Sequence, residues 1–304
     1  MGQISKTLGK DMQRNWSLYL LAVPVILFYL LFAYKPMYGA LIAFKDFSPG
    51  RGFDRSPWIG LEHFSRFFKS PYFFRLLRNT FLISFYGLIF GFPAPIILAL
   101  MLNEVRHSFY KRTIQTITYL PHFISMIVIA GMITDFSLST GLFNDIIEFF
   151  GGTRFPLLQR PNLYRPIYIA SDIWQSVGWG TIIYLSALSG IDPQLYEAAM
   201  IDGAGRFKQL LHITIPSIMP TIIILLILRI GQLLGVGYEK TILLYNPSTY
   251  ETADIISTYV YRVGLLEQNW SYSTAIGLFN SVINFSLLLA ANKISSKVSE
   301  TSLW

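Results

Sequence analysis

Long apolar segments separated by polar ones dominate the pattern of this chain. Six windows of 18 to 23 residues contain only two charged side chains between them, Asp172 and Arg229. A helix that crosses the hydrocarbon core of a bilayer needs about 20 mostly apolar residues. The pattern therefore predicts an all-α integral membrane protein. Its transmembrane helices, about six in number, are expected over residues 16–34, 80–102, 114–133, 166–188, 220–237 and 274–291.

Composition supports lipid as the natural solvent and excludes several kinds of chemistry. Hydrophobic residues make up 53% of the chain and charged residues only 13%. Cysteine is absent, so no disulfide and no cysteine metal site is possible. The four histidines are scattered without ligand spacing, and we expect no bound metal. The net charge of +7 is spread through loops, which favours an anionic lipid surface over nucleic acid as a partner.

Basic residues indicate how the predicted spans are oriented. Lys6, Lys10 and Arg14 precede the first span, and the loop 106–112 and the C-terminal tail carry basic residues on the same predicted side. Cytoplasmic loops are enriched in lysine and arginine, so we expect both termini to be cytoplasmic. The opposite loops contain a comparable number of basic residues, but they are longer, and long loops translocate largely regardless of charge.

The chain shows no short-period repeat and no low-complexity linker. We therefore expect one transmembrane domain over residues 1–304. Within it, residues 1–15 are expected to form a cytoplasmic N-terminal segment, 192–216 a cytoplasmic loop between the fourth and fifth spans, and 292–304 a cytoplasmic tail.

Several residues of the loop 192–216 are typical of the start or the end of a helix. Asp192 is a good N-cap, Pro193 suits the first helical position, and Gly203 suits the left-handed turn that ends a helix. A second short helix is predicted over about 205–213. Helices of two or three turns are marginal alone in water, so we expect both to dock on the rest of the molecule or on a partner.

The same loop carries a motif with a specific resemblance. Glu197-Ala198-Ala199, Asp202-Gly203-Ala204 and Ile213-Thr214-Ile215-Pro216 resemble, in order and spacing, the EAA loop of ABC-importer permeases. The resemblance implies a pair of coupling helices that seat in a groove of an ATPase subunit. The residues expected to couple transport to the ATPase are Glu197, Ala198, Ala199, Asp202, Gly203, Ala204, Arg206 and Pro216.

Other segments extend the resemblance over almost the whole chain. Trp58-Ile-Gly-Leu-Glu62 and Gly141-Leu-Phe-Asn144 are similar to segments of maltose-type carbohydrate permeases. Pro36-Met-Tyr-Gly39 and Leu244-Tyr-Asn-Pro247 resemble the polysaccharide and oligosaccharide permease group. This implies import of oligosaccharides or polysaccharide fragments across a bacterial plasma membrane. The implied partners are a second homologous permease, two ATPase subunits and an extracellular or periplasmic sugar-binding protein.

The chain lacks the phosphate-binding pattern Gly-x4-Gly-Lys-Ser/Thr. We therefore expect no enzymatic activity and no cofactor in this chain, with ATP and Mg²⁺ used by the partner ATPase. Two other classes of membrane protein fit the sequence less well. An ion-coupled secondary transporter would leave the EAA loop without a purpose, and a membrane-embedded enzyme needs convergent nucleophiles, carboxylates or metal ligands that the spans do not offer.

Polar residues in spans are candidates for the substrate pathway because they are costly in lipid. Arg229 is placed near the middle of the fifth span, with Gln232 one turn later. The pair is expected either to line the cavity and bind sugar hydroxyls or a carboxylate, or to form ion pairs within the assembly. Glu239 and Lys240 follow this span and are expected to be solvated or gating residues.

The fourth and sixth spans supply the other candidates. Asp172, Trp174, Gln175 and Trp179 combine charge, amide and indole groups, which suits sugar binding, although the tryptophans also fit an interfacial or packing role. Asn280 and Asn284 lie one turn apart, where they face either the cavity or a neighbouring helix. The expected pathway residues are Asp172, Trp174, Gln175, Trp179, Arg229, Gln232, Asn280 and Asn284.

Overall fold

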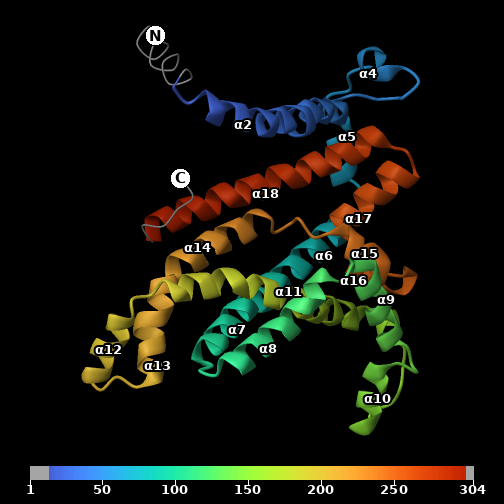
Figure 1. Cartoon of the computed structure of the whole chain (residues 1–304). Coiled ribbons are helices and arrows are strands. Elements are labelled where there is room, and N and C mark those ends of the chain that lie inside the picture. The colour runs from blue at the N-terminus through green and yellow to red at the C-terminus, as the bar shows by residue number, and fades with distance from the viewer. Residues whose placement is uncertain (1–13, 299–304) are drawn as a thin grey trace.

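The computed structural model describes residues 14–298, and α-helices form most of its regular structure (Figure 1). The first long helical segment comprises α2 (Trp16–Phe28), a π-helical stretch (Tyr29–Tyr34), α3 (Lys35–Met37) and a 3-10 stretch (Tyr38–Phe44). The next elements are α4 (Gly52–Arg55), α5 (Glu62–Phe68), α6 (Phe73–Tyr86), a π-helical stretch (Gly87–Gly91) and α7 (Pro93–Glu104). They are followed by α8 (Ser108–Tyr119), a 3-10 turn (Leu120–Phe123), α9 (Met126–Ser137), α10 (Leu142–Phe149), a 3-10 turn (Leu157–Gln159) and α11 (Pro161–Ser189).

The C-terminal half continues with α12 (Pro193–Ile201), α13 (Arg206–Gln209), a π-helical stretch (Leu210–Thr214), α14 (Ile215–Gly231) and α15 (Tyr238–Leu244). The last elements are a 3-10 turn (Pro247–Thr249), α16 (Tyr250–Ala253), α17 (Ile256–Tyr261), a π-helical stretch (Arg262–Leu266) and α18 (Trp270–Val298).

Five helical segments of the described chain are long and apolar enough to cross a membrane, which confirms the all-α membrane fold. They are Trp16–Phe44, Phe73–Glu104, Met126–Phe149, Arg206–Gly231 and Trp270–Lys297. The predicted fourth span falls in α11, whose 29 residues are ample in length. It is not among those five segments, and its polar side chains include the pathway candidates of that span.

The predicted third span, 114–133, is wrong as a single helix. The chain leaves helical geometry at Ile124 and Ser125, between the 3-10 turn after α8 and the start of α9. Pro121 has no backbone N–H to donate, and the Ser125 hydroxyl caps α9 by accepting from the N–H of Val128 at 3.5 Å. The apolar segment that qualifies as a span instead begins at Met126.

The predicted fifth span is also displaced. Helix α14 ends at Gly231, so residues 232–237 are not helical, and Arg229 lies in its last turn rather than in mid-span. In the other direction the helix runs without interruption from Arg206 through α13 and a π-helical stretch into α14. The second short helix predicted over 205–213 is therefore the beginning of this long helix and not a separate element.

Both ends of the described chain lie at one end of the molecule. Figure 1 shows the start of α2, the end of α18 and the pair α12–α13 on the left, with α5 and α15–α17 at the opposite end. This arrangement agrees with termini that share a side with the loop 192–216. Residues 1–13 and 299–304, which belong to the predicted terminal segments, lie outside the described residues.

The segment after α14 is part of the core. Ile255 and Ile256 are 0% and 1% exposed, so this part of the chain is buried inside the molecule. Ile255 packs in a cluster with Ile83, Ile129 and Tyr164, which joins α6, α9 and α11. The chain between α14 and α18 therefore fixes how α11 sits against α6, and this junction holds the polar pocket described next.

Candidate functional site

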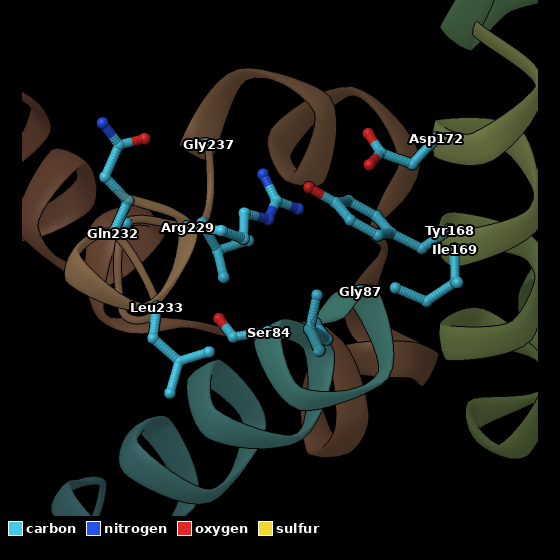
Figure 2. A pocket seen from close by; sticks show the side chains of 12 residues that line it. Ser84, Gly87, Tyr168, Ile169, Asp172, Arg229, Gln232, Leu233 and Gly237 are labelled. Carbon is cyan, nitrogen blue, oxygen red and sulfur yellow. The ribbon is translucent and has the colours of Figure 1, made fainter. Parts of the chain in front are cut away.

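A polar pocket lies where α6, α11 and the non-helical segment after α14 meet (Figure 2). Its volume is about 130 Å³, which is room for about four water molecules. It is lined by Ile83, Ser84, Gly87, Tyr168, Ile169, Asp172, Arg229, Gln232, Leu233, Gly235, Val236 and Gly237. Three of the predicted pathway residues thus meet at one place: Asp172 from α11, Arg229 from the last turn of α14 and Gln232 from the non-helical segment that follows it.

Arg229 presents its guanidinium to the pocket without a partner. Within the part of the chain that the structure describes, no carboxylate lies within 4 Å of it and no hydrogen bond to it is formed. Figure 2 shows the guanidinium beside the Tyr168 ring, while the amide of Gln232 points away from it. An unpaired cation facing a cavity is a natural receptor for an anionic group.

Asp172 has a partner that the sequence did not indicate. The Lys240 ammonium donates to an Asp172 carboxylate oxygen at 3.4 Å and to the carbonyl oxygen of Tyr168 at 3.0 Å. It also lies 4.5 Å from the centre of the Tyr168 ring. The Lys240 side chain is only 3% exposed, so the expectation of a solvated lysine is wrong.

Asn280 and Asn284 of α18 hold the non-helical segment in place. The side-chain N–H of Asn280 donates to the Leu234 carbonyl at 3.2 Å, and the Leu234 N–H donates to the Asn284 side chain at 2.8 Å. Both backbone groups of Leu234 are therefore paired, as a non-helical residue inside a bundle requires. The asparagines bond a neighbouring segment and do not line the polar pocket.

The remaining candidates of α11 lie elsewhere. Trp174 lines an apolar cavity of about 570 Å³ on another face of the helix, together with Phe136 and Leu142. Trp179 is 48% exposed and stacks on the ring of His122, with ring centres 4.6 Å apart. Gln175 is half-buried and does not join the lining of the polar pocket.

Ser84 belongs to the pocket and went unnoticed in the sequence. Its hydroxyl is buried and has no hydrogen-bond partner, and it is one of the lining groups. A buried hydroxyl without a partner costs free energy unless a ligand or water bonds to it. A lone serine in an apolar span carries no sequence signal, so only the folded arrangement identifies it.

The predicted helix α12 forms as expected. The Asp192 carboxylate accepts from the N–H of Gln194 at 2.9 Å, and Pro193 is the first helical residue. Gly203 has φ +74°, and the N–H of Ala204 bonds the Ala199 carbonyl at 2.8 Å across the turn. This is the glycine-terminated helix end that the pattern predicts.

The helix α12 is held to the long helix α13–α14 by one side-chain bond, between the hydroxyls of Tyr196 and Thr214 at 2.9 Å. Most of its other side chains face outward, and the loop has a largely uncovered apolar surface: Met200 is 59% exposed, Ile201 86% and Phe207 70%. Of the other predicted coupling residues, the exposed ones are Glu197, Ala198, Asp202, Gly203, Arg206 and Pro216, and the half-buried ones are Ala199 and Ala204.

A buried ion cluster lies at the opposite end of the molecule from α12. The Asp254 carboxylate is 0% exposed and accepts from Arg262 at 2.9 Å and Arg75 at 3.1 Å. Burial lowers the pKa of Arg262, but the bonded carboxylate outweighs burial and raises that pKa above its ordinary value. The cluster ties α6 to the segment around α16 and α17, and its one carboxylate is paired with both arginines.

A known protein family matches most of the chain. Residues 91–300 match the family described as binding-protein-dependent transport system inner membrane component. The polygalacturonan/rhamnogalacturonan transport system permease protein YteP of Bacillus subtilis (strain 168) is 46% identical over 290 residues, which cover 94% of this chain and 90% of YteP.

Two solved structures are similar over nearly their whole length. One is a bacterial ABC transporter involved in the import of the acidic polysaccharide alginate, with 46% identity, a TM-score of 0.88 and coverage of 96% of this chain and 99% of that chain. The other is a bacterial alginate ABC transporter in complex with an alginate pentasaccharide-bound periplasmic protein, with 45% identity, a TM-score of 0.88 and coverage of 97% and 99%. This chain belongs to the family of binding-protein-dependent transport system inner membrane components.

Proposed function

We propose that this chain is a permease subunit of an ABC importer that takes up oligosaccharides derived from acidic polysaccharides by ATP-driven alternating access. The observation that carries the substrate class is the unpaired Arg229 guanidinium in a polar pocket between spans. A solved relative imports the acidic polysaccharide alginate, and YteP is named for polygalacturonan, whose sugar units carry carboxylates. A cation in the last turn of a membrane span, without an anion beside it, suits such a substrate.

The coupling role falls to α12 and the start of the long helix. An uncovered apolar surface at Met200, Ile201 and Phe207 is the kind of surface that a partner buries. The loop 192–216 carries the EAA pattern around Glu197 and Gly203, and we propose that it docks on an ATPase subunit. Because α13 is continuous with α14, a displacement of the loop is transmitted to Arg229 along one helix.

The complete transporter is proposed to contain this chain as one transmembrane domain, a second homologous permease, two ATPase subunits and an extracellular or periplasmic sugar-binding protein. The ATPase subunits bind and hydrolyse ATP with Mg²⁺. The chain lies in a bacterial plasma membrane with both termini and the loop 192–216 in the cytoplasm. The first span, Trp16–Phe44, buries none of its most apolar window against the rest of the chain. This span is therefore open to pack against a second permease.

The test is affinity purification of the chain from its native membrane in mild detergent, with identification of stoichiometric partners. We expect an ATPase and a second permease to copurify, and we expect the ATPase to be lost when Glu197 and Gly203 are both replaced. Purification of the chain alone or as a homo-oligomer would contradict the proposal and favour an ion-coupled secondary transporter, in which α12 has no ATPase to contact.

A further inference from the structure

We propose that Lys240 sets the charge of the polar pocket. By neutralising Asp172, Lys240 leaves Arg229 free to bind one sugar carboxylate, so that the pocket discriminates acidic from neutral oligosaccharides. This inference rests on the proposed function and assigns a role to a residue that does not line the pocket itself.

The Lys240 ammonium is fixed in place by its neighbours. It is held by three groups, namely the Asp172 carboxylate, the Tyr168 carbonyl and the face of the Tyr168 ring. At 3% exposure it cannot exchange these partners for water. A buried charge with its counter-ion removed is strongly unfavourable, so Lys240 and Asp172 are tied to one another.

Without Lys240, Asp172 would present an unpaired charge to the pocket. The Asp172 side chain is 38% exposed, and it extends from α11 toward the same space as the Arg229 guanidinium, with the Tyr168 ring between them (Figure 2). Opposite charges that face one cavity pair when no other partner competes. Removal of Lys240 therefore frees Asp172 to pair with Arg229 or to repel an incoming carboxylate.

The pocket has room and hydrogen-bond donors for one carboxylate. A cavity of about 130 Å³ takes a carboxylate and a few waters but not an oligosaccharide, so the pocket is a subsite and the rest of the sugar lies outside it. The guanidinium offers paired N–H donors that match the two carboxylate oxygens. The nearest guanidinium nitrogen is 3.5 Å from where a Gly87 side chain would begin, an ordinary contact distance, so the guanidinium lies against the chain at Gly87.

Ser84 is a second and independent indication of a ligand. Its buried hydroxyl lines the same pocket and has no partner in the described chain. A sugar hydroxyl or carboxylate oxygen entering the pocket would satisfy it. The pocket thus combines an unpaired cation with an unpaired hydroxyl, while its one carboxylate is already occupied.

The experiment uses the transporter complex, with its partner permease and ATPases, in lipid nanodiscs without the binding protein. Binding of galacturonate trisaccharide is compared by calorimetry with binding of its methyl ester, which has the same length and rings but no charge. The variants are Lys240→Met, the double variant Asp172→Asn/Lys240→Met, and Lys293→Met as a control at an exposed position of α18.

We expect the wild type and Lys293→Met to bind the acid more tightly than the ester. Lys240→Met should weaken binding of the acid by roughly tenfold or more and leave the ester nearly unchanged, because one charged hydrogen-bonded contact is worth that much. The double variant should recover most of the lost affinity, since Arg229 is again the only charge. If Lys240 had only a structural role, Lys240→Met would weaken binding of both the acid and the ester, and the double variant would not restore it.

Three results would overturn the inference: equal weakening for acid and ester in Lys240→Met, no recovery in the double variant, or no preference for the acid in the wild type. If Lys240→Met fails to assemble, the double variant alone decides, because it must keep the preference for the acid. The broader proposal fails by a different observation, namely the absence of an ATPase among the copurifying partners.

Discussion

Replacement of Gly203 by valine tests how the loop 192–216 transmits motion. Gly203 has φ +74°, and no atom lies within 4 Å of the position that a side chain would take. A new side chain therefore meets no neighbour, and its cost is the backbone conformation alone, about 1–2 kcal/mol for the left-handed region and more for a β-branched residue. A cost of this size changes the population of the native turn by roughly 5- to 30-fold.

Loss of the turn should release α12 from its position while the spans remain folded, because Gly203 is exposed and lies outside the core. We expect Gly203→Val to reduce substrate-stimulated ATP hydrolysis and uptake several-fold in the reconstituted transporter. The matched control is Gly205→Ser, since Gly205 has φ −69° and open space around it, and serine is a favourable N-cap for α13. Full coupling in Gly203→Val, equal to that of Gly205→Ser, would refute the reasoning.

Three further changes have defined outcomes. Tyr196→Phe removes the bond to Thr214, worth about 1 kcal/mol, and should lower stimulated ATP hydrolysis two- to fivefold while the ATPase still copurifies; unchanged stimulation would mean that this bond does not transmit motion. Asn284→Leu leaves the Leu234 N–H without its acceptor and should lower the thermal midpoint of the purified complex, at a cost of about 1–3 kcal/mol. Asp254→Asn weakens its pairs with two arginines and should destabilise the complex by about 3 kcal/mol, the low end for a buried pair because the arginines are 24% and 30% exposed; an unchanged urea midpoint would contradict this.

The sequence predicted best what depends on local pattern. The cap at Asp192, the helix start at Pro193 and the turn at Gly203 follow from the chemistry of single residues and were all found. The lengths of the apolar windows likewise predicted most of the spans. The break at Ser125 was missed because apolar residues continue through it, and hydropathy does not record where a proline and a capping serine end one helix and start another.

The pocket was predicted only in part, since its assembly depends on contacts between distant residues. Asp172 and Arg229 stood out as charges in apolar spans, and the structure brings them to one cavity. The burial of Lys240 was not predicted, because its partner Asp172 lies 68 residues away and no local pattern connects the two residues. The non-helical segment that carries Leu234 is held by asparagines of α18, and this again requires the folded structure.

The most direct test of the account is uptake of galacturonate trisaccharide by proteoliposomes that contain the complete transporter and its binding protein. We predict accumulation of the trisaccharide only when ATP and Mg²⁺ are present on the cytoplasmic side, and at least a tenfold loss with Arg229→Ala, since a charged contact of about 1.4 kcal/mol or more is removed. Accumulation driven by a proton or sodium gradient without ATP would contradict the account, and so would undiminished uptake by Arg229→Ala.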